Sequence, residues 1–148
     1  MTASDCHPLA AVFLTENLRL NGLTAMKYRQ GQWGGELSGA SGTSKVDQSA
    51  FASNDGSTAL HGKFELILGS DVLYERDESG ALAGFIDKHA AASAQVWIVD
   101  PHRSNRPAFN RQMAGLGFDL FQERLDRVAT VSQLAYRGRL LKYWRTQT

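Results

Sequence analysis

The sequence predicts an α/β protein built on an open, mostly parallel sheet with an antiparallel hairpin at its edge. Two short apolar runs of β-prone residues, 64–68 (FELIL) and 96–99 (VWIV), are separated by a stretch with helical spacing. Another helical stretch follows, and the chain ends in two strand-like segments. Strands that alternate with helices favour parallel pairing, and a final hairpin favours an antiparallel edge. Both runs are apolar enough to be central strands covered on two faces.

The first thirty residues predict a strand, a helix and a weaker strand. Residues 2–5 have the character of the last residues of a strand. Apolar residues recur at spacings near three and four over 7–20, and Asn21-Gly22 is a typical stop signal, so a helix is expected there. Residues 25–28 are a weak strand candidate.

The sequence patterns that indicate helices and strands are stronger in the second half of the chain. Apolar residues at helical spacing predict helices over 82–89 and 107–116. Residues 118–125 (FDLFQERL) alternate apolar and polar side chains, as a half-buried strand does. Residues 140–144 (LLKYW) are expected to pair with them across a turn at residues 137–138.

Residues 34–62 are rich in Gly, Ser, Ala, Asn and Asp and carry no sustained period. A loop of that length is uncommon inside a compact domain, so it is either an insertion or a flap over a site, and we favour an insertion. The 148-residue chain has the length of one domain, and we expect a single partial domain over 1–148.

Charge and cysteine content narrow the class of protein. The 16 basic and 15 acidic side chains nearly cancel, and like charges are not gathered into a block, so a nucleic-acid partner is not indicated. Cys6 is the single cysteine, and the sequence shows neither a leader nor a long apolar run. We expect a cytoplasmic protein without a membrane partner, and we leave its oligomeric state open.

Three acids directly follow strand-like runs: Asp5, Asp71 and Asp100. In open α/β sheets ligands bind beyond the carboxyl ends of the strands. A carboxylate at such a position can accept hydrogen bonds from both hydroxyls of a ribose, and Asp5 is placed for that role. The alternative is that Asp5 caps the helix that follows it, and the two roles can coexist.

Four segments together carry a more specific pattern. Residues 64–75 (FELILGSDVLYE) place an Asp-x-x-Tyr motif after a strand, and residues 97–101 (WIVDP) place Asp-Pro after the next one. Before them, residues 2–8 (TASDCHP) precede a helix that ends with ENLRLNG at 16–22. In this order the segments resemble class I, seven-strand methyltransferases that use S-adenosylmethionine (SAM). The resemblance is strongest to the family that includes many protein-lysine methyltransferases.

The resemblance implies a Rossmann-like sheet with SAM as the cofactor. By position it implies that Asp5 binds the ribose, with Cys6 beside it in the cofactor site. It also implies that Trp33 lies beside the adenine, although an exposed or core tryptophan is the plainer alternative.

The resemblance further implies methyl transfer to an amine, either a protein lysine side chain or a small molecule. Methyl transfer is an in-line displacement by a neutral nucleophile, so catalysis rests on positioning and needs no metal. The residues implied to line the gap between sulfonium and substrate are Ser70, Asp71 and Tyr74, of which Asp71 and Tyr74 are the catalytic candidates. Tyr74 alternatively packs on the sheet. Asp100 and Arg103 border the substrate pocket in one interpretation, and Asp100 stabilises a turn in the other.

The sequence departs from the family at its front. The family carries a first strand and a Gly-rich loop before the strand that ends at Asp5, where glycines let the backbone approach the cofactor closely. The glycines at 31–35 and 115–117 lie in the wrong places for that role. In the family's strand order the absent strand sits between the strands that end at Asp5 and Asp71. We therefore expect an N-terminally truncated methyltransferase domain or, alternatively, a non-catalytic remnant that serves as a binding module.

Other chemistries lack a starting residue. No His or Cys pair has zinc-type spacing, and neither a Gly-x-Ser-x-Gly elbow nor a Gly-Lys-Ser phosphate loop is present. A flavin or NAD domain would need phosphate-binding glycines of its own.

Overall fold

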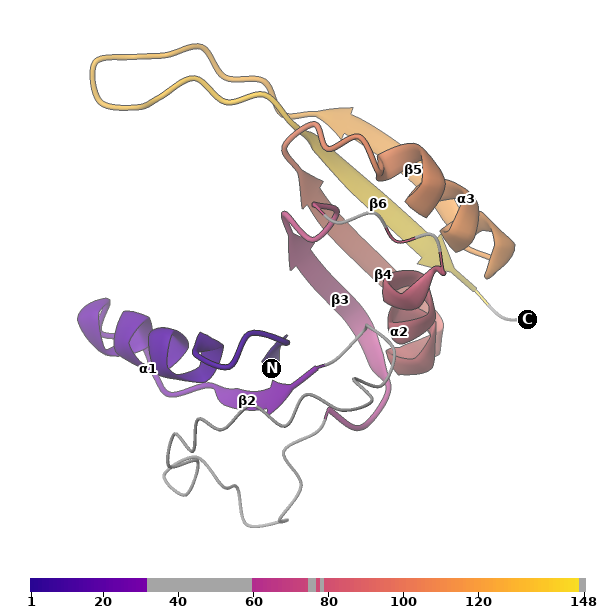
Figure 1. The fold of residues 1–148 in the computed structure, drawn as a ribbon, viewed down its shortest axis with the longest axis horizontal. Helices are drawn as coiled ribbons and strands as arrows, with labels where there is room; N and C mark the ends of the chain where they lie inside the picture. The colour runs from indigo at the N-terminus through magenta and orange to yellow at the C-terminus, as the bar shows by residue number, and fades with distance from the viewer. Residues whose placement is uncertain (32–59, 75–76, 78, 147–148) are drawn as a thin grey trace. The chain divides into compact units, whose positions relative to one another are not determined.

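The structure is a computed structural model that describes residues 1–31, 60–74, 77 and 79–146. Its elements in chain order are β1 (Thr2–Asp5), α1 (Ala10–Leu20), β2 (Lys27–Gln30), β3 (Phe64–Ser70), α2 (Ala81–His89), β4 (Ala90–Asp100), α3 (Arg106–Gly115), β5 (Asp119–Arg124) and β6 (Arg139–Arg145) (Figure 1). The chain divides into two compact units, Met1–His61 and Gly62–Thr148. This mixture of strands and helices confirms the predicted α/β class, while the expectation of a single domain over 1–148 stays a prediction.

The first unit is a β-α-β arrangement. β1 and β2 pair in parallel, with Asp5 opposite Gln30, and α1 connects them. The helix is followed by Gly22 with φ +63, a left-handed conformation that favours glycine at a helix end. The strand predicted at 2–5 and the helix predicted to end at Leu20 are confirmed. The weak strand candidate at 25–28 lies two residues later, over Lys27–Gln30.

The second unit holds a four-stranded sheet in the order β3-β4-β6-β5. β3 and β4 are parallel, and the pairs β4/β6 and β6/β5 are antiparallel, which confirms the predicted edge hairpin. β4 lies inside the sheet, as expected of a central strand. β3 is its terminal strand, however, because among the described residues it pairs with β4 alone. The prediction that residues 64–68 form a central strand is therefore wrong for this sheet.

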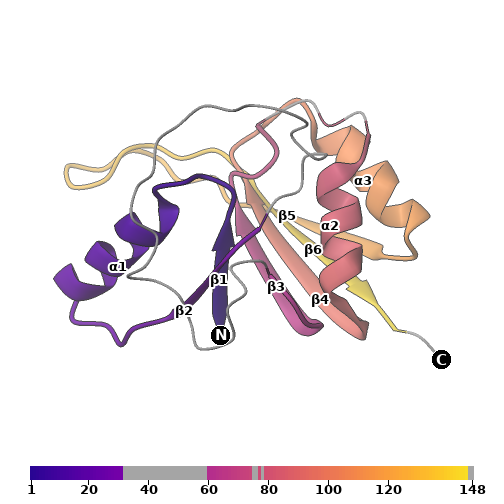
Figure 2. The same cartoon turned by 60° about the horizontal axis from the view of Figure 1, so that its bottom comes forward.

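One face of the four-stranded sheet packs against α2 and α3 (Figure 2). The pleat of β4 and β6 sends alternate side chains to this face, where they form the core. The rings of Phe109 on α3 and Tyr143 on β6 meet edge to face, with centroids 5.6 Å apart. The buried residues that the two helices and the two inner strands contribute include Leu82, Ala83, Ile86, Phe109, Met113, Val96, Ile98, Leu141 and Tyr143.

The opposite face of this sheet is apolar and exposed. Lys142 lies over the rings of Trp97 and Phe121, at 5.3 and 5.7 Å from their centroids, so the aromatic residues of this face gather around one cation. The large apolar side chains exposed on this face are Leu66, Leu68, Trp97, Phe121 and Trp144. The β3 side chains on this face, Leu66 and Leu68, are thus exposed to solvent.

The connection between β5 and β6 projects beyond the sheet (Figure 1). Thr130 N donates a hydrogen bond to Gln133 O at 2.8 Å, which closes a turn near the tip of the connection. The turn predicted at 137–138 is therefore wrong. Gly138 O accepts a hydrogen bond from Leu125 N at 3.0 Å, so that position belongs to the paired arms of the hairpin. None of the described helices is both long and apolar enough to cross a membrane.

Candidate functional site

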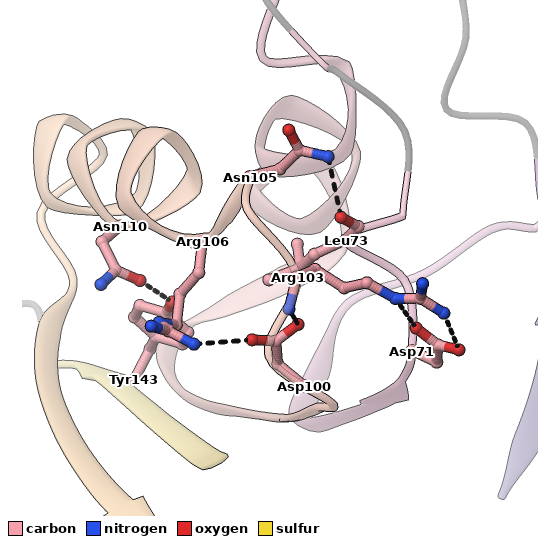
Figure 3. A network of polar contacts seen from close by, with 8 residues as sticks. All are labelled: Asp71, Leu73, Asp100, Arg103, Asn105, Arg106, Asn110 and Tyr143. Carbon is pink, nitrogen blue, oxygen red and sulfur yellow. Dashed lines mark hydrogen bonds and ion pairs between the residues drawn. The ribbon is translucent and has the colours of Figure 1, made fainter. Parts of the chain in front are cut away.

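The candidate site of the second unit lies where β3 and β4 end. The two strands are parallel, so their carboxyl ends meet at the same edge of the sheet, the edge at which open α/β sheets bind ligands. Asp71 directly follows β3, and Asp100 is the last residue of β4. Figure 3 shows how the segments that follow the two strands are held together by polar side chains.

Asp71 is clamped by Arg103. The guanidinium Nε and NH2 atoms donate to the two carboxylate oxygens, both at 2.7 Å, in the fork geometry that arginine provides (Figure 3). Asp71 takes φ +53, a left-handed conformation that is uncommon for a residue other than glycine. Its backbone N donates to Val99 O at 2.9 Å and prolongs the β3/β4 ladder by one residue.

The contact with Arg103 favours the charged form of Asp71. The hydrogen bonds from Arg103 hold the pKa of the Asp71 carboxyl below its ordinary value, and the same contact raises the pKa of Arg103. The two side chains remain 45% and 43% exposed, respectively. Asp71 is therefore an accessible carboxylate that stays charged at neutral pH.

Asp100, in contrast to Asp71, is shielded from solvent. Its side chain is fully buried, and its Oδ2 accepts a hydrogen bond from Arg106 NH1 at 3.0 Å. Its Oδ1 accepts one from the backbone N of Arg103 at 3.1 Å. These contacts anchor the segment after β4 to the end of the strand. Of the two interpretations of Asp100, the geometry favours turn stabilisation over contact with a substrate.

The segment after Asp71 is also tied to the residue that precedes α3. Asn105 Nδ2 donates to Leu73 O at 2.9 Å, and the Leu73 side chain is buried (Figure 3). The next residue, Tyr74, is 51% exposed. Both interpretations of Tyr74 therefore stay predictions. Ser70, the last residue of β3, is exposed one residue before Asp71.

A partly buried hydrogen bond near Asp100 was not predicted from the sequence. The Tyr143 hydroxyl donates to Asn110 Oδ1 at 2.6 Å (Figure 3). Burial, together with the nearby charge of Asp100, raises the pKa of the Tyr143 phenol well above its ordinary value. No sequence signal marks Arg106, Asn105 or Asn110 as partners, because they become neighbours of the strand ends only when α3 packs on the sheet.

The first unit places Asp5 at the carboxyl end of β1. Its Oδ1 accepts a hydrogen bond from His7 N at 2.7 Å, and His7 Nδ1 accepts one from Leu9 N at 3.2 Å. The carboxylate thus stabilises the turn before α1, whereas helix capping by Asp5 is not observed, since the helix begins only at Ala10. Cys6 is exposed beside it.

Two further points concern predicted sites. Trp33 lies outside the described residues, so its expected place beside the adenine stays a prediction. Within the described ranges, no three His, Cys, Asp or Glu side chains are grouped closely enough to hold a metal ion.

Comparison with known proteins identifies the fold. The sequence matches no protein-family model and no curated protein. Among solved structures, it is similar to a methyltransferase from Pyrococcus furiosus (TM-score 0.63, 14% identity, 99% of this chain, 62% of that one). It is also similar to the ribosomal protein L11 methylase from Lactobacillus delbrueckii subsp. bulgaricus (TM-score 0.53, 18% identity, 99% of this chain, 58% of that one).

A third similar structure contains a product of the cofactor. It is the N-methyltransferase NodS from Bradyrhizobium japonicum WM9 in complex with S-adenosyl-L-homocysteine (TM-score 0.56, 11% identity, 99% of this chain, 66% of that one). The chain spans 62% of the length of the Pyrococcus furiosus chain and 58% of the length of the L11 methylase. The chain therefore shares the Rossmann-like α/β fold of SAM-dependent methyltransferases.

Proposed function

We propose that the chain is part of a SAM-dependent methyltransferase that transfers a methyl group to an amine, with a protein lysine side chain as the favoured acceptor. The observation that carries the proposal is the exposed carboxylate of Asp71 at the carboxyl end of β3, whose pKa is lowered by the hydrogen bonds from Arg103. The names of two similar structures support it, because one acts as an N-methyltransferase and another methylates a ribosomal protein.

Two of the acids at strand ends, Asp5 and Asp71, suit the chemistry of the cofactor. Asp5 offers a carboxylate at the end of β1, the type of group that accepts hydrogen bonds from both hydroxyls of a ribose. Asp71 offers a negative charge of the kind that favours a positively charged sulfonium or ammonium nearby. We assign Asp5, with Cys6 and Trp33, to the cofactor and Ser70 and Asp71 to the gap between cofactor and substrate.

When bound, SAM would supply a methyl group on a positively charged sulfur, which leaves with the electrons of the broken C–S bond. The acceptor nitrogen must be neutral, so a lysine ammonium, with a pKa of about 10.4, loses a proton to solvent before it attacks. Because Arg103 lowers the pKa of Asp71, that carboxylate is a poor base. In the proposed mechanism it accepts a hydrogen bond from the amine and orients its lone pair. The exposed Tyr74 phenol would provide a second oriented contact.

The clamp on Asp71 gives Arg103 a role in this mechanism. An amine that approaches Asp71 meets a carboxylate whose two oxygens already accept from Arg103. Each carboxylate oxygen has two lone pairs, so one further N–H donor can bind without removal of the arginine. We assign Arg103 to positioning Asp71, and its predicted direct contact with substrate stays a prediction.

The first test is titration of SAM into the 148-residue chain by calorimetry, with circular dichroism of the same sample. In a form of the chain that binds SAM, Asp5→Ala should weaken binding by roughly 1.5 to 3 kcal/mol, because charge-assisted hydrogen bonds to the ribose are lost. Asp119→Ala, which removes an exposed carboxylate on β5, is the matched control and should leave the affinity unchanged.

The second readout is transfer of labelled methyl from SAM to lysine-containing peptides. Asp71→Asn should lower turnover more than it weakens SAM binding, because the amide keeps the size but not the charge of the group that orients the amine. If a folded chain binds no SAM, the proposal fails for this polypeptide.

The alternative function is a binding module without catalysis, and one observation favours it. Arg103 engages both oxygens of Asp71, as a purely structural ion pair would. Binding of SAM without transfer to any amine, unchanged by Asp71→Asn, would support the binding module over the enzyme.

A further inference from the structure

The connection between β5 and β6 forms a two-stranded arm, residues 125–138, that extends beyond the sheet (Figure 1). Leu125 N donates to Gly138 O, and the backbones of Arg127 and Tyr136 donate to each other in both directions. A strand rises about 3.3 Å per residue, so each half of this hairpin arm, about six residues long, spans roughly 20 Å.

The base of the hairpin arm lies at the edge of the sheet that carries the candidate site. β6 runs antiparallel to β4, and its first residue, Arg139, pairs with Asp100, the last residue of β4. The pKa of Asp126 in the arm is lowered by the hydrogen bond from Arg124 and also by the charge of His102, so the segment after β4 lies near the base of the arm. A partner bound along the arm would therefore lie beside the candidate site and not in it.

The arm and its base carry mostly positive charge. Residues 124–139 include four arginines and one aspartate, whereas the whole chain has a net charge of +1. The register sets Arg124 opposite Arg139, and like charges in such a pair repel. Two residues farther along the arm it sets Asp126 opposite Arg137, on the same face. Arg139 Nε is buried and has no hydrogen-bond partner among the described residues, so this face has more donors than acceptors.

The outer part of the arm is apolar. Val128, Val131 and Leu134 are each more than 80% exposed. Large apolar side chains that are exposed together and flanked by polar residues are typical of sites that bind another protein. The arm therefore offers apolar contacts near its tip and arginines near its base.

The aromatic residue of the arm argues against a nucleic-acid partner. Single-stranded nucleic acids bind by stacking their bases on aromatic side chains. Tyr136 is the single aromatic residue of 125–138, and its ring lies against Gly138, where an added Cβ would be 2.7 Å from Tyr136 Cε1. The valines and the leucine suit apolar side chains of a protein instead. Charge and apolar surface together favour an acidic protein segment.

We propose that the hairpin arm docks an acidic segment of the protein substrate that also carries large apolar side chains. Carboxylates of the segment pair with Arg124, Arg137 and Arg139, and its apolar side chains pack on the tip. The inference rests on the proposed function, because it takes the methyl acceptor to be a protein. An extended chain covers roughly 20 Å in about six residues, so the lysine that reaches Asp71 lies at least about that far along the substrate from the part bound at the tip.

Binding of a synthetic peptide tests the arm separately from catalysis. The probe is a fluorescein-labelled peptide without lysine, with glutamates in one half and leucines in the other, and fluorescence anisotropy measures its affinity for the 148-residue chain. Val131→Ser combined with Leu134→Ser should weaken binding about tenfold or more, since burial of one such side chain is worth that factor. Arg124→Gln combined with Arg137→Gln should weaken it about fivefold, because exposed ion pairs are lost. Arg111→Gln, at an exposed arginine of α3, is the control and should leave the affinity unchanged.

NMR titration of the unaltered chain locates the bound peptide without any variant. The amide signals of residues 124–139 should shift as peptide is added, and those of α2 should not. Absence of binding, or binding that leaves the signals of the arm unchanged, would overturn the proposal. Tighter binding of a single-stranded RNA oligonucleotide to the arm would also overturn it and assign the arm to a nucleic acid.

Methyl transfer distinguishes this proposal from the function on which it rests. In a form of the chain that transfers methyl groups, the substitutions in the arm should raise KM for a lysine peptide that carries the acidic segment and leave kcat unchanged. An unchanged KM would overturn docking and leave the proposed function intact. Peptide binding that depends on the arm, without transfer to any lysine, would support docking and contradict the proposed function.

Discussion

Asp71 and Asp100 occupy equivalent places at the ends of two neighbouring parallel strands, yet their surroundings are opposite. Asp71 is 45% exposed and its Arg103 partner 43%, whereas Asp100 is fully buried and Arg106 is 20% exposed. The exposed pair can be reached by a ligand and is screened by salt. The buried pair is shielded from both. The same local pattern, an acid after an apolar strand, thus yields a candidate reactive group in one case and a structural anchor in the other.

The two pairs are linked through one short segment. The backbone N of Arg103 is held by Asp100, while the side chain of Arg103 holds Asp71. The buried acid therefore positions the residue that clamps the exposed one. Damage to Asp100 should affect both stability and the Asp71 clamp, whereas damage to Asp71 should leave Asp100 intact.

The largest effect is expected from Asp100→Asn. The substitution leaves the Arg106 guanidinium in a mostly buried position without a counter-charge, and should lower the free energy of unfolding by about 3 kcal/mol. Urea denaturation followed by circular dichroism measures the change. Asp71→Asn is the matched control at the exposed strand end, where ion pairs contribute little to stability. Equal losses from the two substitutions would contradict the distinction between them.

A smaller loss of stability is expected from substitutions at Gly69 on β3 and Ile98 on β4, where the two strands pack closely just before the two acids. A Cβ at Gly69 would lie 2.7 Å from Ile98 Cδ1, and Ile98 is buried. Gly69→Ala should therefore cost about 1 to 3 kcal/mol through overpacking. Ile98→Val removes Cδ1 and alone should cost about 0.5 to 1.5 kcal/mol.

The double variant tests the cause of that cost. If the clash is responsible, Gly69→Ala combined with Ile98→Val should be clearly more stable than the sum of the single losses predicts. Additive losses would assign the cost of Gly69→Ala to the backbone instead. Thermal unfolding monitored by calorimetry distinguishes the two results.

The sequence predicts most elements of the fold but not their extents or neighbours. The runs at 64–68 and 96–99 are β-prone and became β3 and β4. β4 also extends back to Ala90 through AAASAQ, residues with little strand preference, because Ala90 pairs with Phe64 on β3. The apolar content of residues 64–68 indicates burial on two faces and not which strands are present to pair, so by itself it could not predict β3 at the sheet edge.

The two acids of the candidate site were predicted from the sequence, but the exposure and the partners of their side chains were not. Asp71 and Asp100 follow strands of similar character, and the sequence offers two arginines, Arg103 and Arg106, within six residues of Asp100. Which arginine meets which acid depends on where α3 begins and on the left-handed turn at Asp71. Such long-range geometry has no local signature, so exposure and partner could be assigned only from the structure.

The smallest expected effect is the pH dependence of the exposed pair. Arg103 lowers the pKa of the folded Asp71 carboxyl, so the pair stabilises the fold above the unfolded-state pKa, and this stabilisation is lost as pH falls through the lowered folded value. NMR titration of the Asp71 carboxyl carbon should give a pKa below the ordinary value. Arg103→Gln should raise that pKa toward the ordinary value, and Arg111→Gln, at an exposed arginine of α3, should leave it unchanged. Added salt should narrow the difference, since the pair is open to solvent. An Asp71 pKa that does not respond to Arg103→Gln would mean that the clamp does not persist in solution, and that Asp71 is free to act as a base.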